Sequence, residues 1–126
     1  MSSKTKNIIN WVLAGLVGFI FLSSAYGKFT GGAEDAKMAE TLGLSARNIT
    51  LIGIVELAAI ILFLIPRTGV LGTLLLVAYM GGAIATHLEH GLSIAAPAGI
   101  AAFVWIVAVI RFPELLSRIT GKWLTK

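Results

Sequence analysis

Four long runs of apolar residues divide the chain. They cover residues 8–26, 49–65, 70–86 and 94–110, and none of them holds more than one charged residue. At about 1.5 Å of rise per residue, each run forms a helix roughly 25–29 Å long. That length nearly matches the hydrocarbon core of a bilayer, which is about 30 Å thick. A soluble helix needs a polar stripe at helical period, and these runs have none. The pattern therefore predicts an all-α integral membrane four-helix bundle, with residues 1–126 forming a single membrane domain.

The composition agrees with this interpretation. Of the 126 residues, 57% are hydrophobic and 13% are charged, whereas a soluble domain carries about 25% charged residues. The first run also exceeds the roughly 7–15 apolar residues of a signal-peptide core. We therefore expect it to remain as a helix of the mature protein.

The distribution of charge predicts an orientation. One side of the predicted membrane collects seven basic residues against one acid, and the other collects three basic residues against four acids, with Glu56 left inside a run. Positive residues gather in cytoplasmic loops, so both termini are expected to be cytoplasmic, in a bacterial inner or plasma membrane. The net charge of +4 then reflects orientation and contact with the lipid bilayer, and no nucleic-acid partner is expected.

The connections between the runs carry their own signals. Residues 33–43 predict a short helix ended by Gly43, and its Met38 and Leu42 would rest on the membrane surface. Ser45 is expected to cap the second span. The tight turn at residues 66–69 makes spans two and three antiparallel neighbours.

After the fourth run, Pro113 starts a predicted amphipathic surface helix over residues 113–124. A partner-binding helix is the alternative. Its apolar face would hold Leu115, Leu116, Ile119 and Trp123.

Small residues recur four apart inside the runs, a spacing that lets membrane helices approach closely. We expect them to pack the chain's own helices together, and a dimer face is the alternative. The pairs are Ala14 and Gly18, Gly81 and Ala85, Ala95 and Gly99, and Ala98 and Ala102.

Glu56 is the one charged residue inside a predicted span, about 10 Å from its outer end. A charge at that depth costs a few kcal/mol, so it must be protonated, paired or facing water. The hydroxyls of Ser23 and Ser24 fall at the same outer level, and so do four further polar or aromatic residues: Tyr26, Lys28, Thr86 and His87. We predict that these four form a polar cluster with Glu56 that lines an outward-facing ligand pocket. The alternative is a buried network that only holds the helices together.

Other chemistry is largely excluded. The chain has no cysteine, so thiolate catalysis and cysteine-ligated metals are ruled out. Two histidines on one short segment do not make a metal site, and there is no nucleophile motif. The sequence therefore predicts no catalytic residue, no metal and no free-standing enzyme.

The sequence of residues 53–88 resembles that of a known protein family. The segment runs from a Gly-x-x-Glu-Leu start through a Pro-Arg-Thr turn to a Gly-Gly-Ala and Thr-His end. With Gly27-Lys28 and Leu42-Gly43 upstream, it resembles the DoxX-like family of small four-span membrane proteins. The family is named after a subunit of a thiosulfate:quinone oxidoreductase, and other members are linked to membrane oxidoreductase complexes or to receptor-assembly chaperones.

The resemblance implies a four-helix fold and directs attention to the positions that match the family's polar motif. These are Lys28, Glu56, His87 and the turn residues Pro66 and Arg67. It also implies other membrane subunits or self-association as partners, and quinone as a candidate cofactor.

Two functions remain. The first is a non-catalytic accessory or assembly subunit of a larger membrane complex. The alternative is a quinone- or lipid-binding subunit of a membrane oxidoreductase, with a pocket around Glu56 and His87. A cavity beside Glu56 would favour the second function, and tight packing around a fully paired Glu56 would favour the first. A transporter is less favoured because the chain shows no inverted repeat.

Overall fold

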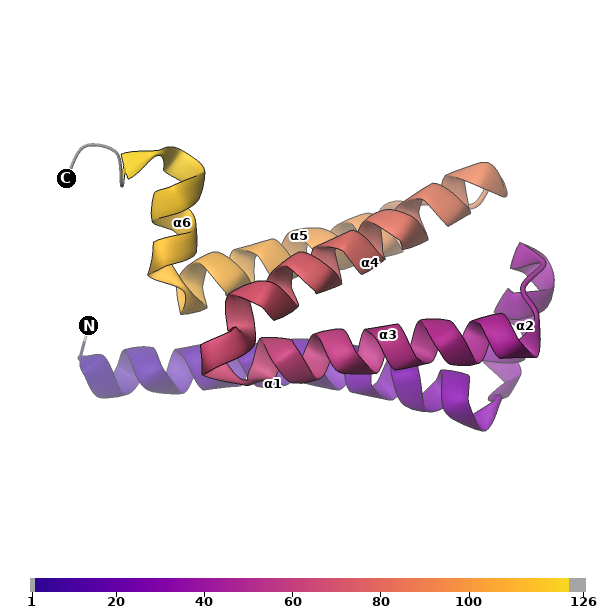
Figure 1. Ribbon diagram of the computed structural model, residues 1–126, viewed down its shortest axis with the longest axis horizontal. Coiled ribbons are helices and arrows are strands. Elements are labelled where there is room, and N and C mark those ends of the chain that lie inside the picture. The colour runs from indigo at the N-terminus through magenta and orange to yellow at the C-terminus, as the bar shows by residue number, and fades with distance from the viewer. Residues whose placement is uncertain (1, 123–126) are drawn as a thin grey trace.

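The structure, a computed structural model, describes residues 2–122, and every regular element in that range is helical (Figure 1). The prediction of an all-α chain is therefore confirmed for the described residues. The elements are α1 (Ser3–Thr30), α2 (Ala33–Leu42), α3 (Ala46–Leu64), the 3₁₀ turn η1 (Pro66–Thr68), α4 (Gly69–Glu89), α5 (Ala95–Arg111) and α6 (Pro113–Thr120).

Four long helices pack as consecutive neighbours: α1 on α3, α3 on α4, and α4 on α5. Figure 1 shows α1 beside α3 in one layer and α4 with α5 in the other. The layers meet near η1 and diverge toward α2, so the molecule has an η1 end and an α2 end. The start of α1 and the whole of α6 lie at the η1 end.

The helix ends follow local signals in the sequence. The Ser45 hydroxyl accepts a hydrogen bond from the Asn48 amide at 3.1 Å, which confirms the predicted cap of α3. The predicted short helix is α2, and Gly43 ends it in the left-handed conformation with φ 68°. Gly31 ends α1 in the same way, with φ 66°. Glycine tolerates this conformation because it has no Cβ.

Three segments are long and apolar enough to cross a membrane: α1, α3 and the stretch from η1 through α4. The 17-residue α5 is a candidate fourth span only if it is counted together with α6. The chain bends by 106° between these two helices. Large apolar side chains face outward along these helices; Phe19 is 72% exposed and Ile54 is 51% exposed. Such a surface requires a lipid environment, so the chain is an integral membrane protein.

The helices are packed most tightly near η1. A Cβ on Gly72 would overlap the backbone of Phe63, so α3 and α4 touch there through their main chains. The Phe63 ring packs edge-on against Phe112, with centroids 6.2 Å apart. Small residues permit this close approach between membrane helices.

The small-residue pairs do not all pack as predicted. Gly18 faces the Leu64 side chain, where a Cβ would lie 3.4 Å away, as expected for packing within the chain. A Cβ on Gly81 or Gly99 would meet nothing within 4 Å among the described residues, apart from the adjoining backbone of its own helix. The internal-packing prediction is therefore wrong for these two glycines, because they lie on the outer faces of α4 and α5.

The last helix, α6, ends at Thr120, earlier than the predicted residue 124. Proline occupies its first turn as expected. On the predicted apolar face, Leu115 is buried, whereas Leu116 and Ile119 are exposed. Trp123, the fourth member of that face, lies outside the described residues.

Candidate functional site

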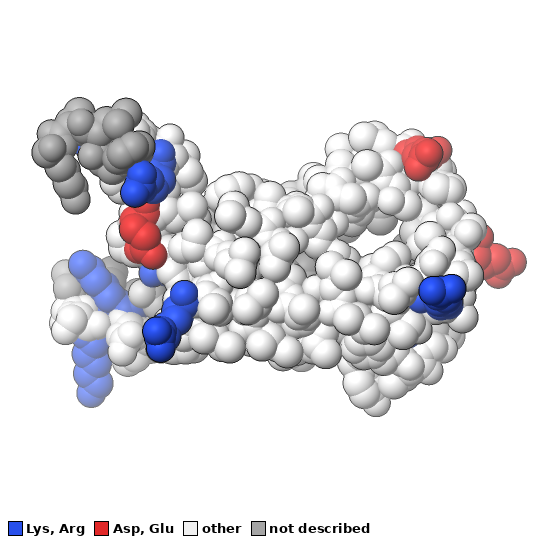
Figure 2. Space-filling view, in the orientation of Figure 1, with Lys and Arg blue, Asp and Glu red and all other residues white. Residues whose placement is uncertain are grey.

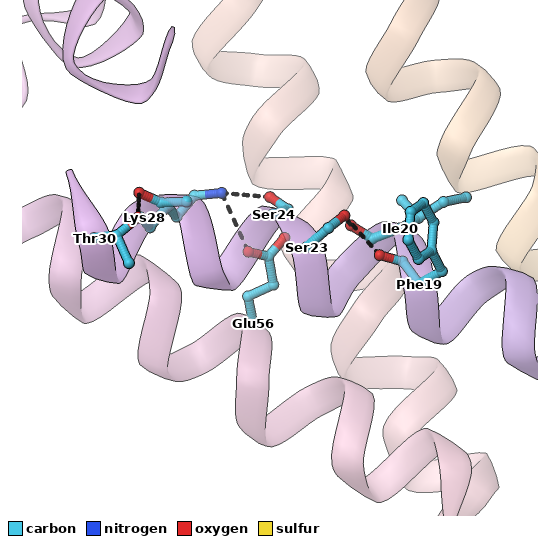
Figure 3. A network of polar contacts seen from close by, with 8 residues as sticks. Phe19, Ile20, Ser23, Ser24, Lys28, Thr30 and Glu56 are labelled. Atoms are coloured by element: carbon cyan, nitrogen blue, oxygen red, sulfur yellow. Dashed lines mark hydrogen bonds and ion pairs between the residues drawn. The ribbon is translucent and has the colours of Figure 1, made fainter. Parts of the chain in front are cut away.

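Glu56 and Lys28 form an ion pair between α3 and α1. The Lys28 Nζ lies 3.1 Å from Glu56 Oε1 and donates a second hydrogen bond to Ser24 Oγ at 2.6 Å (Figure 3). Glu56 is 1% exposed. Gly53 lies one turn before it, and a Cβ there would meet Lys28 Cβ at 3.2 Å. The missing side chain thus lets α1 approach closely enough for the pair to form.

Two hydroxyl groups complete this polar cluster. The hydroxyl groups of Ser24 on α1 and Tyr79 on α4 both lie close enough to the Glu56 carboxylate to interact with it. The Tyr79 ring packs edge-on against Phe21, with centroids 6.3 Å apart. Among residues 2–122, no buried side-chain nitrogen or oxygen lacks a hydrogen-bond partner. Three helices therefore meet at a satisfied polar cluster of Ser24, Lys28, Glu56 and Tyr79.

A cavity of about 410 Å³ lies beside this cluster, at the α2 end. Figure 2 shows the molecule hollowed there, between its two layers. One part of the wall is apolar and comes mainly from α2, α3 and α4. It includes Met38, Leu42, Leu44, Ile49, Ile52 and Ala78. The polar part of the wall consists of Lys28, Asp35, Tyr79, Thr86 and His87.

The histidine on this wall has a defined tautomer. His87 Nδ1 lies 2.7 Å from the carbonyl oxygen of Ala83, which can only accept, so Nδ1 carries the proton. In a neutral imidazole this leaves Nε2 as an acceptor. The neighbouring Thr86 hydroxyl donates to the carbonyl of Gly82 at 2.8 Å, so its oxygen can still accept. His87 and Thr86 therefore contribute acceptors to the cavity.

Helix α2 covers the cavity. It contains no buried residue, and its Asp35, Met38 and Leu42 line the cavity wall. Met38 and Leu42 thus face this cavity, whereas the sequence predicted that they would contact the membrane surface. A second, more polar cavity of about 500 Å³ lies between α2 and the adjoining ends of α1 and α3, and Lys28 and Asp35 line both.

The structure brings together most of the residues predicted for the site. Lys28 pairs with Glu56, and Lys28, Thr86 and His87 share the cavity wall. Tyr26 does not join them: its side chain is 70% exposed and contributes nothing to the cavity.

The turn residues Pro66 and Arg67 form η1, at the opposite end of the molecule (Figure 1). Both are exposed, and they set the connection between α3 and α4.

Sequence reasoning missed Tyr79 and Asp35. Tyr79 lies seven residues before Thr86, so the two share a helix face, and Ala83 lies between them on that face. Asp35 precedes Met38 by three residues and Leu42 by seven, which places all three on one face of α2. These spacings are visible in the sequence, but they do not show that the two faces meet.

Arg111 is one of the seven basic residues that served only to predict the orientation from the sequence, and it has a structural role at the η1 end. Its guanidinium donates to the carbonyl oxygens of Phe63 and Leu64, at 2.9 and 3.4 Å. It also lies 4.9–5.3 Å from the ring centroids of Trp11, Phe63 and Phe112. Arg111 thereby ties the end of α5 to the last turn of α3.

The comparison with protein families agrees with this architecture. The model of the DoxX-like family matches residues 12–109, well over half of the chain. The chain belongs to the DoxX-like family. The matched stretch contains the whole polar cluster and the cavity wall, and it ends before Arg111 and α6. No curated protein and no solved structure matches the chain.

Proposed function

We propose that this DoxX-like protein binds an amphipathic molecule of the quinone or lipid class in the cavity at its α2 end. It does so as a non-catalytic accessory subunit of a larger membrane complex. The observation that carries the proposal is the cavity of about 410 Å³ beside the Lys28–Glu56 pair. A network that only held the helices together would not need this space.

The size and lining of the cavity suit such a ligand. Small-molecule sites occupy about 300–1,000 Å³ and combine apolar walls with a few convergent polar groups. An acyl or isoprenoid chain would contact the apolar wall around Ile49 and Ile52. The ligand's head would lie against Lys28, Tyr79 and His87.

Lys28 supplies the donor for a ligand oxygen. An ammonium group carries three N–H donors, and two are used on Ser24 and Glu56. The third is left for a carbonyl oxygen such as that of a quinone. Electrons would come from a partner subunit, since the proposed role of this chain is to hold and orient the ligand.

The proposed topology follows from the charges. In it, four helices cross the membrane, the η1 end with its basic residues is cytoplasmic, and the α2 end faces outward. The membrane is a bacterial inner or plasma membrane. Figure 2 supports this assignment, because Lys and Arg side chains gather at the end of the molecule where α1 starts.

A role in assembly is the second candidate, and a different observation favours it. Gly81 with Ala85 and Ala95 with Gly99 leave exposed small-residue surface on α4 and α5. In a bilayer, such surface allows a helix of another subunit or of a second copy to pack closely.

Substitutions of two neighbouring glycines distinguish the ligand-binding function from the role in assembly. Gly82 lines the cavity and Gly81 does not, and both have open space where a side chain would go. Gly82→Leu should fill the cavity, whereas Gly81→Leu matches it in helix, size and apolarity. The measurement is native mass spectrometry after gentle extraction from the native membrane.

We expect a bound small molecule of stoichiometric mass on the wild type and on Gly81→Leu, and its loss in Gly82→Leu. Wild type without such a ligand would refute the binding role. A co-purifying subunit lost only in Gly81→Leu would support the role in assembly.

A further inference from the structure

One carboxylate on the cavity wall, that of Asp35, has no counter-charge within ion-pair distance among residues 2–122. Asp35 lines the cavity from α2, and within residues 2–122 its side chain makes no hydrogen bond and no ion pair. It is partly buried, and one of its oxygens lies against Gly27 on α1. A carboxylate held beside a ligand space without a partner is available to the ligand.

The other charges of the wall cancel. Lys28 carries a positive charge, but Glu56 lies 3.1 Å from it and compensates that charge. His87, Tyr79 and Thr86 add nothing to the formal charge at pH 7. The wall and the Glu56 behind it therefore hold a net charge of one negative unit, located on Asp35.

The charged residues around the cavity also carry a net negative charge. The α2 end carries five acidic residues against three basic ones. The acids are Glu34, Asp35, Glu40, Glu56 and Glu89, and the bases are Lys28, Lys37 and Arg47. A surface with net negative charge attracts cations and repels anions.

The hydrogen-bonding groups point to the same kind of ligand. Asp35, Thr86 and His87 Nε2 offer acceptors, against the one remaining N–H of Lys28, because the Tyr79 hydroxyl proton is directed to Glu56. Most of the polar wall is therefore satisfied by a head group that donates hydrogen bonds. Tyr79 also offers an aromatic ring, which attracts a cation at its face.

We propose that Asp35 determines the head-group specificity of this site, and that the site takes an amphiphile with a cationic, proton-donating head and excludes anionic ones. A protonated amine on an apolar tail is the matching chemistry. This inference rests on the proposed ligand-binding function, and of its two ligand classes it selects a lipid with an amine head over a quinone.

The test uses three probes that share one tail: dodecylammonium, dodecan-1-ol and dodecanoate. Their affinities are measured near pH 7 by native mass spectrometry and by thermal stabilisation of the purified protein in a non-ionic detergent. The variants are Asp35→Asn and, as a matched control, Glu34→Gln. The control removes one acidic charge from the same turn of α2 and does not line the cavity.

We expect the wild type to bind dodecylammonium at least about tenfold more tightly than dodecanoate, with dodecanol between them. Asp35→Asn should reduce that ratio by about tenfold, since it removes a charge in direct contact with the head group. Glu34→Gln should change it by less than about twofold, because its charge is exposed and screened.

The outcomes separate the two proposals. Preferential binding of dodecanoate, or equal effects of the two variants, would overturn the role of Asp35 while leaving the cavity as a ligand site. If none of the three probes binds, this inference fails, whereas the proposed function fails only if the wild type also carries no small molecule after extraction from its native membrane.

Discussion

The two ends of this molecule pair their buried and partly buried charged groups in different ways. At the η1 end, Arg111 donates to main-chain carbonyls of α3 and lies against three aromatic rings, and the helices touch. At the α2 end, Lys28 and Glu56 satisfy each other through their side chains, and a cavity lies beside them. An arginine that donates hydrogen bonds to main-chain carbonyls holds two helices in close contact. A side-chain ion pair can hold two helices together and still leave space for a ligand beside it.

The largest effect on stability is expected from Glu56→Gln at the α2 end. It leaves the Lys28 charge, whose side chain is 14% exposed, without a counter-charge. Breaking a buried pair in this way costs about 3 kcal/mol. Thermal unfolding in detergent measures the loss, and Lys28→Gln combined with Glu56→Gln should recover most of it. A Glu56→Gln variant as stable as the wild type would show that the pair does not hold the α2 end together.

A matched pair of glycines tests the difference in packing. Gly72→Ala places a Cβ into the Phe63 backbone near η1 and should cost about 2–3 kcal/mol. Gly82→Ala meets open space and should be neutral or stabilising by up to about 1 kcal/mol, because alanine favours helix. Unfolding midpoints of the two variants give the comparison. Equal losses would contradict the contrast between a tight end and an open one.

Arg111→Gln should have a smaller effect, about 2 kcal/mol. It removes two hydrogen bonds to carbonyls and the contacts with the rings. Arg111→Lys keeps the positive charge but lacks the two guanidinium nitrogens that reach both carbonyl oxygens. It should therefore recover less than half of the stability lost in Arg111→Gln. Unfolding measurements that place Arg111→Gln level with the wild type would mean that close helix packing alone maintains the η1 end.

The sequence predicted the helices well because their signals are local. Apolar length, the Ser45 cap and the Gly43 terminus act within a few residues, and the structure follows them. The pairing of Glu56 with a partner could also be anticipated, since a buried charge requires neutralisation and Lys28 ends the neighbouring helix.

The rest depends on how helices are placed against one another. Nothing local indicates that α3 and α4 diverge toward α2, so the cavity and the roles of Tyr79 and Asp35 on its wall could not be derived. The contact of Met38 and Leu42 with this cavity was missed for the same reason. Tyr26 illustrates the converse case: it lies at the expected level of the membrane, but helix rotation turns its side chain outward.

The central claim is that the α2 end contains an open, ligand-sized cavity, and thiol labelling tests it most directly. The chain has no cysteine, so each of two variants carries a single thiol. Ala83→Cys places it on the cavity wall, and Ala59→Cys places it in the core, where the alanine is 1% exposed. In membrane vesicles, a small water-soluble methanethiosulfonate reagent should modify Ala83→Cys and leave Ala59→Cys unmodified, and a bound amphiphile should slow the first reaction. An Ala83→Cys thiol as unreactive as that of Ala59→Cys would contradict the account.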